Sequence, residues 1–155
     1  MVYLWGKNYS GQLGDGTTGH KLVPAQALKV NHTAVEAEGL ELLPSEGSIG
    51  MYEDSAASGG RAVGYIDNYG DNLQFYNHYI PGKIIRVRYA ALNSGTMNLY
   101  INGAYAQSVS FDSTGAWTGR YASKLIYVPI PESSTLKLQY DRGSVPVNID
   151  AIEVF

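Results

Sequence analysis

The feature that most constrains this fold is the recurrence of short runs in which apolar and polar residues alternate. Such runs return roughly every eight to twelve residues from Val35 to the C-terminus, separated by glycine- and asparagine-rich turns. Alternation places every second side chain on one face of a strand, and no useful window has the 3.6-residue apolar period of a helix. We therefore predict an all-β fold, an antiparallel β-sandwich of jelly-roll type.

The predicted strands follow these alternating runs. They cover residues 35–43, 61–67, 72–77, 83–92, 97–101, 105–111, 122–128, 136–140 and 148–155. Asn102-Gly103 separates two of them and is a strong signal for a two-residue hairpin turn. In the longest run, Ile85, Val87 and Tyr89 share one face.

Composition excludes several classes of function. The chain has no cysteine, which rules out disulfides and thiolate metal sites. Its net charge is −3, and its 11 basic residues do not cluster, so we expect no nucleic-acid partner. No stretch approaches the ~20 apolar residues of a membrane span, so we expect no membrane partner either. Thirteen tyrosines and eighteen glycines suit strands and turns. We expect a monomer.

Residues 1–30 differ from the rest of the chain. The run Trp5-Gly6-Lys7-Asn8, continued by G-Q-L-G-D-G-T at 11–17, resembles one repeat of the regulator-of-chromosome-condensation type, a β-propeller unit. A propeller needs several such repeats to bury its faces. We therefore expect residues 1–30 to be the remnant of an upstream propeller, residues 31–35 to be a junction, and residues 36–155 to be the main domain.

Acidic residues near both ends of the main domain are candidate metal ligands. Glu36 and Glu38 lie two apart on a predicted strand, so both carboxylates would leave the same face and repel. A calcium ion, which takes six to eight oxygen ligands, would compensate them. Asp150 on the last strand and the glycine-rich turn that begins at Ser58 are further candidate ligands. The alternative is that the two glutamates lie on a solvated face, and the pattern alone favours neither.

Residues 34–155 resemble a carbohydrate-binding module of the family 6 and family 35 group. The resemblance is carried by E-A-E at 36–38, S-G-G-x-x-V-G-Y-I-D at 58–67, V-R-Y-A at 87–90, N-L-Y-I-N-G at 98–103, T-G-x-W at 114–117 and N-I-D-x-I-x-V at 148–154. It implies a galactose-binding-like sandwich and a structural calcium. The implied ligands are Glu36, Glu38, the backbone oxygen of Arg61 and Asp150, with Ser58 in the same turn.

The same resemblance implies a sugar site. Its aromatic pair would be Tyr65 and Trp117, which would sandwich a sugar ring, and Asn148 would bind the sugar hydroxyls. Each residue also has a structural reading. Trp117 could be a core tryptophan, Tyr65 could be buried by strand alternation, and Asn148 could be a turn amide. Asn148 lies two positions before Asp150 and would share its face.

The sequence departs from the family pattern in its expected binding loops. Tyr69 interrupts the usual I-D-x-G-D run, and the second aromatic residue after T-G-x-W is shifted to Tyr121. Arg120 precedes it and could meet the carboxylate of a uronic-acid-bearing glycan. The alternative is that Arg120 is a solvated surface residue without a ligand. We include Tyr69, Arg120 and Tyr121 among the candidate ligand-binding residues.

No catalytic motif is present, and the acids Glu53, Asp54, Asp67 and Asp71 have no spacing that specifies a glycosidase pair. We therefore expect a protein that is not an enzyme. The resemblance implies a calcium-stabilised module that anchors a larger polysaccharide-degrading protein to plant cell-wall polysaccharide or oligosaccharide. We expect it to be secreted and bacterial, at the cell surface or in an enzyme complex. The alternative is a structural or protein-interaction sandwich that packs against the upstream propeller.

Overall fold

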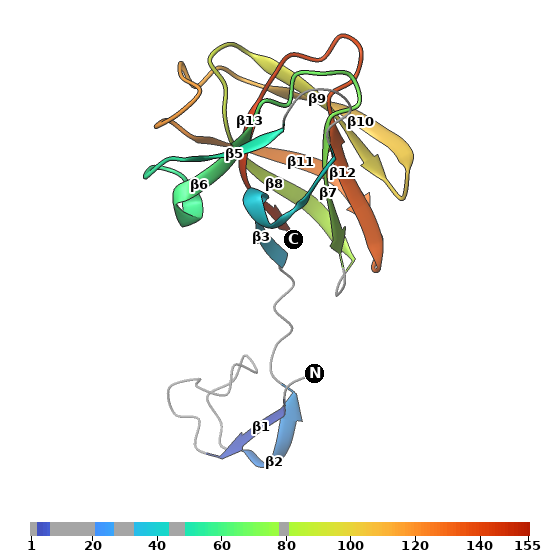
Figure 1. The fold of residues 1–155 in the computed structure, drawn as a ribbon. Coiled ribbons are helices and arrows are strands. Elements are labelled where there is room, and N and C mark those ends of the chain that lie inside the picture. Colours follow the sequence, from blue (N-terminus) through green and yellow to red (C-terminus); the bar gives the residue numbers. More distant parts are fainter. Residues whose placement is uncertain (1–2, 7–20, 27–32, 44–48, 78–80) are drawn as a thin grey trace. The chain divides into compact units, whose positions relative to one another are not determined.

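The computed structural model describes residues 3–6, 21–26, 33–43, 49–77 and 81–155, with side chains for 34–37, 39–41, 49–77 and 81–155. The chain divides into two compact units, Met1–Val30 and Asn31–Phe155 (Figure 1). In the first unit, β1 (Tyr3–Gly6) and β2 (Lys21–Gln26) form an antiparallel pair. Neither short helix of the described residues is long and apolar enough to cross a membrane.

The second unit consists of strands joined by turns and two short 3₁₀ helices. The strands are β3 (Thr33–Glu36), β4 (Glu41–Leu43), β5 (Gly50–Glu53), β6 (Arg61–Gly64), β7 (Asn72–Asn77), β8 (Gly82–Ala90), β9 (Gly95–Ile101), β10 (Ala104–Phe111), β11 (Ala122–Ile130), β12 (Ser134–Gln139) and β13 (Asn148–Val154). The 3₁₀ helices are η1 (Ala37–Gly39) and η2 (Ser58–Gly60).

These strands form two sheets that pack face to face, which confirms the antiparallel β-sandwich (Figure 1). One sheet has the order β10-β9-β12-β7-β4. The other has the order β11-β8-β13-β6-β5, with β3 paired to β13. Every strand pair described is antiparallel. Because β13 lies at the centre of its sheet, its first residues are held between strands on both sides.

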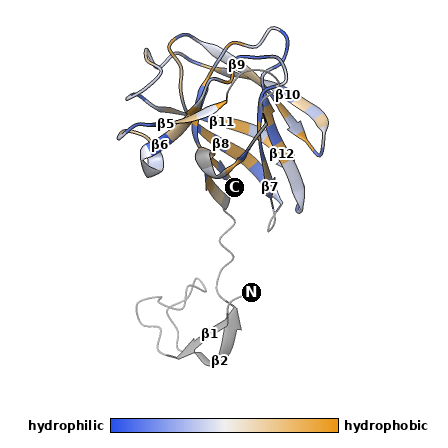
Figure 2. Cartoon of the chain, in the orientation of Figure 1, coloured by the Kyte–Doolittle hydropathy of each residue, from blue (hydrophilic) through white to orange (hydrophobic). Residues whose placement is uncertain are grey.

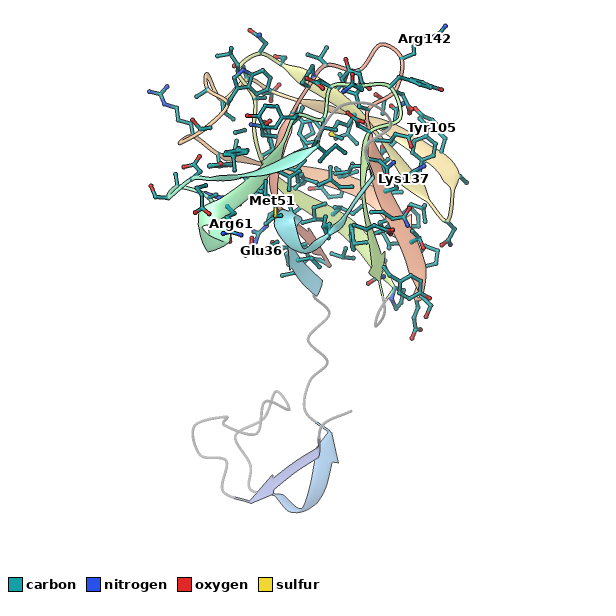
Figure 3. All side chains as sticks on the ribbon, viewed as in Figure 1. Glu36, Met51, Arg61, Tyr105, Lys137 and Arg142 are labelled. Atoms are coloured by element: carbon teal, nitrogen blue, oxygen red, sulfur yellow. The ribbon has the colours of Figure 1, made fainter. Side chains whose placement is uncertain are left out.

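The core fills the space between the two sheets, and orange apolar positions alternate with pale or blue ones along the strands (Figure 2). Ile85, Val87 and Tyr89 are all buried on the inner face of β8, as their spacing predicts. The ring of Tyr89 meets Phe111 edge to face, with centroids 4.8 Å apart. On the outer face of the five-stranded sheet, Tyr105 and Lys137 project away from this core (Figure 3).

Several predicted strands match the structure closely. The expected run 72–77 is β7, and Asn102-Gly103 forms the turn between β9 and β10. Both turn residues have positive φ, 52° for Asn102 and 79° for Gly103, as a type I′ hairpin requires. Strand β5 was not among the predicted strands, because its four residues are too short a run to show alternation.

The first predicted strand, 35–43, is wrong as a single element. The chain leaves β3 after Glu36, turns through η1 and enters the other sheet as β4. The two-residue spacing of Glu36 and Glu38 therefore does not place them on one strand face. The predicted junction 31–35 also overlaps β3, since Thr33 pairs with Val154 on β13. Pairing to the last strand draws these residues into the sandwich.

Candidate functional site

A cavity of about 560 Å³ opens at the end of the sandwich where β5, β6 and β13 meet the loop before β11. Its lining contains three aromatic residues, two carboxylates and a few small or polar groups. They are Tyr52, Glu53, Gly64, Tyr65, Asp67, Trp117, Thr118, Pro146 and Asn148. Three residues that the sequence analysis singled out, Tyr65, Trp117 and Asn148, are thus brought to one cavity from three distant segments.

Tyr65 is exposed, with 63% of its surface accessible, so strand alternation does not bury it. It directly follows β6 and has a φ of 60°, in the left-handed region that non-glycine residues rarely adopt. A backbone outlier of this kind costs about 1–3 kcal/mol and often marks a functional site. The ring lies beside Gly50, where an added Cβ would sit 3.5 Å from Tyr65 Cδ2. The strained backbone therefore presents a tyrosine face to the cavity.

Trp117 is also at the surface, with 36% of its area accessible, and is not the core tryptophan of the alternative reading. Its loop is fixed at the start by Thr114, whose amide N donates to Ala91 O at 2.8 Å and whose Oγ1 accepts from Ala91 N at 3.1 Å. Thr114 Oγ1 also donates to Ala116 O at 3.1 Å. The backbone before Trp117 is therefore anchored to the end of β8, while the ring stays open to solvent.

Asn148 and Tyr52 hold the same loop from the opposite side of the cavity. Asn148 Nδ2 donates to Trp117 O at 2.9 Å and to Tyr52 Oη at 3.1 Å, and Tyr52 Oη donates to Trp117 O at 3.1 Å. Asn148 Oδ1 lies close above Gly64, where a Cβ would approach it to 2.9 Å. Only glycine at this position leaves room for the amide. Both Asn148 donors are used internally, which leaves its Oδ1 as the group that can accept from a ligand hydroxyl.

Tyr121 and Asp54 form a second layer beneath Tyr52. Tyr121 Oη donates to Asp54 Oδ2 at 2.8 Å and lies 3.1 Å from Tyr52 Oη. Burial, followed by its hydrogen bonds to Tyr52 and Asp54, raises the pKa of Tyr121 far above its usual value. The amide of Gly119 is the main group that lowers the pKa of Asp54, with Ala56 N and Tyr121 Oη adding to it. Tyr121 is therefore a protonated donor to an ionised carboxylate at neutral pH.

The remaining predicted ligand-binding residues do not line the cavity. Tyr69 is 68% exposed in the loop after β6, and Arg120 is exposed with Nη1 near Gly115. Tyr121 lies behind Tyr52 and beneath the guanidinium of Arg88, whose Cζ is 4.6 Å from its ring centroid. The sequence analysis missed Tyr52 as a lining residue because it missed β5. No motif pointed to Thr118 or Pro146, whose position depends on how the loops fold together.

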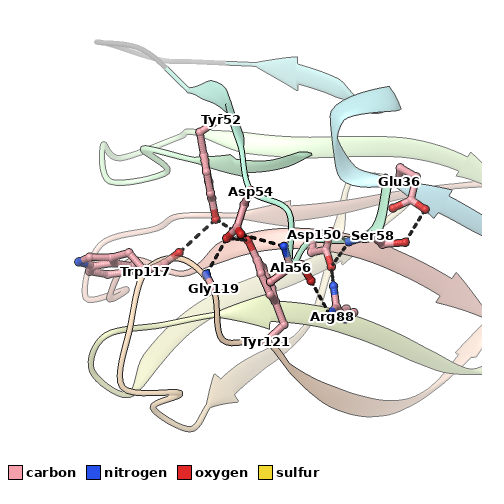
Figure 4. A network of polar contacts seen from close by, with 10 residues as sticks. All are labelled: Glu36, Tyr52, Asp54, Ala56, Ser58, Arg88, Trp117, Gly119, Tyr121 and Asp150. Carbon is pink, nitrogen blue, oxygen red and sulfur yellow. Dashed lines mark hydrogen bonds and ion pairs between the residues drawn. The ribbon is translucent and has the colours of Figure 1, made fainter. Parts of the chain in front are cut away.

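A second polar cluster lies beside this network, and Ser58 of η2 is at its centre (Figure 4). Ser58 Oγ donates to Glu36 Oε1 at 2.7 Å, and its amide N donates to Asp150 Oδ1 at 2.9 Å and Oδ2 at 3.1 Å. Glu36 Oε2 is buried and has no hydrogen-bond partner among the described residues. A first-strand glutamate and the last-strand aspartate thus meet at one serine, with one acceptor oxygen unsatisfied.

Arg88 supplies a positive charge to this cluster. Its Nη1 forms an ion pair with Asp150, which is completely buried, and its Nη2 donates to Ala56 O at 3.0 Å. Asp150 is the extra residue of a β-bulge, since Ile149 pairs with Tyr89 while Ala151 already pairs with Arg88. Bulges redirect side chains. Strict two-residue alternation therefore does not relate Asn148 to Asp150, and the two side chains serve different clusters.

The other predicted metal ligands are only partly described. The side chain of Glu38 lies outside the described residues. Arg61 begins β6 directly after η2, and its guanidinium forms an ion pair with Glu53 at 2.9 Å. Among the side chains that the structure describes, no three His, Asp or Glu groups come together as a metal site. Glu36 and Asp150 are an incomplete but suitable oxygen set for a hard cation, and a calcium site there stays a prediction.

Comparisons with known proteins give one family-model match and several similar solved structures. The regulator of chromosome condensation (RCC1) repeat matches residues 1–37, which confirms the predicted propeller repeat. No curated protein sequence matches the chain significantly. Among solved structures, the chain is similar to a family 35 carbohydrate binding module from Clostridium thermocellum, with 28% identity and a TM-score of 0.68. That match covers 79% of this chain and 97% of the module.

Two further structures share the fold. A native family 35 carbohydrate binding module from Clostridium thermocellum has 22% identity and a TM-score of 0.65, covering 80% of this chain and 97% of the module. An exo-beta-1,3-galactanase from Phanerochaete chrysosporium with beta-1,3-galactotriose has 20% identity and a TM-score of 0.67. This match covers 81% of this chain but only 30% of the galactanase. The resemblance to family 35 carbohydrate-binding modules is thereby confirmed.

Proposed function

We propose that the sandwich unit binds one sugar residue of a glycan in the cavity between Tyr65, Trp117 and Asn148. The observation that supports this most directly is the convergence of these three residues on one cavity of about 560 Å³. The two exposed rings offer apolar faces to the C–H face of a sugar, and Asn148 Oδ1 accepts from a hydroxyl. The likeness to a family 35 module supports the same ligand class. An open site of this kind favours a Kd on the order of 10⁻⁵–10⁻³ M.

The charge of the cavity favours an uncharged sugar. Two negatively charged residues line the cavity, Glu53 and Asp67, and among the described residues its lining contains no lysine or arginine. Arg120, the residue expected to meet a uronate, lies outside the lining. Arg61 offsets the charge of Glu53, so a uronic acid would meet mainly the repulsion of Asp67, which raises its electrostatic energy. The proposed ligand is therefore a neutral hexose or pentose unit.

The proposed role includes no chemical step. A glycosidase needs one carboxylic acid kept protonated by an apolar setting, next to a second carboxylate. Glu53 has 79% of its side chain exposed and is paired with Arg61, which is a poor setting for such an acid. The contribution of the module would then be proximity, because binding raises the concentration of the attached protein at the glycan. We propose that the attached protein degrades polysaccharide outside a bacterial cell.

We further propose that calcium binds at Glu36 and Asp150, with Glu38 as a third carboxylate. Glu36 Oε2 supports this, because it is buried without a hydrogen-bond partner among the described residues, and such an oxygen is costly unless a cation or donor satisfies it. The ion would supply positive charge that ties β3 to β13. Arg88 already forms an ion pair with Asp150. The calcium ion would therefore add a second positive charge beside the two carboxylates.

The sugar-binding proposal is tested by titrating neutral mono- and oligosaccharides into the full chain and following heat and tryptophan fluorescence. We expect Trp117→Ala to weaken binding at least about tenfold, since it removes a stacking surface worth about 1.4 kcal/mol or more. The matched control is Tyr127→Ala, which removes an exposed aromatic residue of β11 outside this cavity. The control should bind like the parent protein.

Failure of every neutral glycan to bind, or equal binding by Trp117→Ala, would overturn the proposal. In that case the exposed rings would favour the alternative, a protein-interaction sandwich. A direct assay of reducing-end release from the bound polysaccharide checks the non-catalytic role. Products above the level of a heat-inactivated sample would contradict it.

A further inference from the structure

We propose that Asp54 is a positioning residue that sets the place and orientation of the Trp117 ring through Gly119 and Tyr121. This inference rests on the proposed sugar site and names the group that organises it. Asp54 does not line the cavity, so it would act on the ligand only through the loop. Figure 4 shows the carboxylate between the turn after β5 and the loop that carries Trp117.

Alternate residues of the loop form the hydrogen bonds that hold it. Trp117 O accepts from Tyr52 and Asn148, Gly119 N donates to Asp54 Oδ2 at 2.6 Å, and Tyr121 Oη donates to the same oxygen at 2.8 Å. Each contact joins the loop to β5, to the turn after it or to β13. Loop residues 117–121 are therefore held at three successive points along one side.

Proton counting shows why Asp54 is needed. Tyr121 has one hydroxyl proton, and an ionised carboxylate can only accept, so that proton goes to Asp54. The Tyr121 oxygen is then left to accept from Tyr52, whose single proton is shared between Tyr121 and Trp117 O. The Asp54 carboxylate, at the acidic end of this series of hydrogen bonds, thus sets the direction in which Tyr121 donates. Without that end, the Tyr121 hydroxyl loses its acceptor, whereas Tyr52 can still donate to Trp117 O.

Asp54 is itself held firmly. Its amide N donates to Gly60 O at 3.0 Å, its O accepts from Ala57 N at 3.0 Å, and its Oδ1 accepts from Ala56 N at 3.0 Å. Both carboxylate oxygens therefore accept. An asparagine has only one accepting end, so it must turn an NH₂ group toward either the amide of Ala56 or the Gly119–Tyr121 pair.

The Asp54 contacts matter for the Trp117 ring because they hold the part of the loop that follows it. The ring is at the surface, and the residues on either side of it include Gly115 and Gly119 with φ of 80° and 74°. Glycine backbones have many accessible conformations, so a loop that contains two of them loses order easily. A ring that must stack on a sugar binds more tightly when its conformation is set in advance.

The test uses the full chain with Trp5→Phe, so that Trp117 is the only tryptophan. Asp54→Asn and Tyr121→Phe are compared with this parent, and the second keeps the ring beneath Arg88. We measure acrylamide quenching of Trp117 well below the unfolding temperature, and the Kd for the tightest neutral sugar. We expect quenching to rise about twofold and the Kd to rise about fivefold, the effect of losing roughly 1 kcal/mol of hydrogen bonding.

The matched control is Asp112→Asn, an exposed aspartate at the start of the same loop, which should leave both quantities at the parent value. Tyr121→Phe keeps the test decisive if Asp54→Asn does not fold. Unchanged quenching in the folded variants would overturn the positioning role, even if affinity fell. If the parent binds no sugar, the proposed function fails, while the quenching comparison still decides whether Asp54 orders the loop.

Discussion

The cavity proposed to bind sugar and the carboxylate cluster meet on β13, two residues apart, yet their polar groups are satisfied in different ways. Around Asn148, hydroxyls, amides and the Asp54 carboxylate satisfy one another in a closed chain. Around Asp150, two carboxylates share one serine, only Asp150 pairs with Arg88, and Glu36 Oε2 remains without a described partner. Within the described residues, the first region leaves Asn148 Oδ1 to accept from a ligand, whereas the second has a buried acceptor without a partner.

This difference shows what each region requires from outside. A network of neutral hydroxyls and one carboxylate can close on itself because hydroxyls both donate and accept. Carboxylates only accept, so two of them need an excess of donors or a cation. The cavity is therefore organised before a ligand arrives, while the cluster is the region that we propose a cation stabilises. Three measurements can sharpen or break this contrast.

The largest effect is expected for Asp150→Ala. The substitution leaves the Arg88 guanidinium and the Ser58 amide without their carboxylate, so we expect the free energy of unfolding to fall by about 3 kcal/mol. Arg88 is partly exposed and can reach water, which keeps the loss at the low end of the usual range. Urea unfolding followed by circular dichroism measures it.

The comparison variant is Asn148→Ala, which removes two hydrogen bonds of the cavity network. We expect it to cost only about 1 kcal/mol of stability, because its partners can turn toward solvent or toward each other. It should also weaken sugar binding. Equal stability losses for the two variants would show that the two regions do not differ in the way described here.

The second prediction concerns calcium. Added at about 100 times its Kd, it should raise the free energy of unfolding by about 2.7 kcal/mol, and chelation should reverse the gain. Glu36→Gln should remove most of the effect, because it takes away the negative charge at Oε2, which has no partner in the described part of the chain. Differential scanning calorimetry with and without calcium measures both. Identical melting curves for calcium-loaded and chelated protein would contradict a cation site at this cluster.

The smallest effect is expected for charge discrimination at the cavity. A neutral sugar that binds should do so about fivefold more tightly than its uronic acid counterpart, because Asp67 repels the added carboxylate while Arg61 offsets the charge of Glu53. High salt and the Asp67→Asn variant should both reduce the ratio, since one screens the repulsion and the other removes its main source. Calorimetric titration in calcium-free buffer measures the ratio. A uronate that binds as tightly as the neutral sugar would contradict the proposed ligand class.

Much of this protein could be predicted from local sequence signals. Short alternating runs specified most of the strands, because a half-buried sheet surface requires that pattern. The hairpin at Asn102-Gly103 was predictable because few residue pairs accept two positive φ angles. Motifs at 65, 117 and 148 named residues that the structure places at one cavity. Pairwise spacing failed where the chain leaves a regular strand, at η1 after Glu36 and at the bulge of Asp150.

The sequence by itself determined the class of fold, the propeller repeat at the N-terminus and three of the residues that line the cavity. Only the tertiary structure decided that Tyr52 and Asp54 stand behind Trp117, that Tyr121 supports the loop from the second layer, and that Arg88 reaches Asp150. The physical reason is range. Strand patterns and turns depend on neighbours along the chain, whereas hydrogen bonds between residues more than sixty positions apart depend on how sheets and loops pack in space.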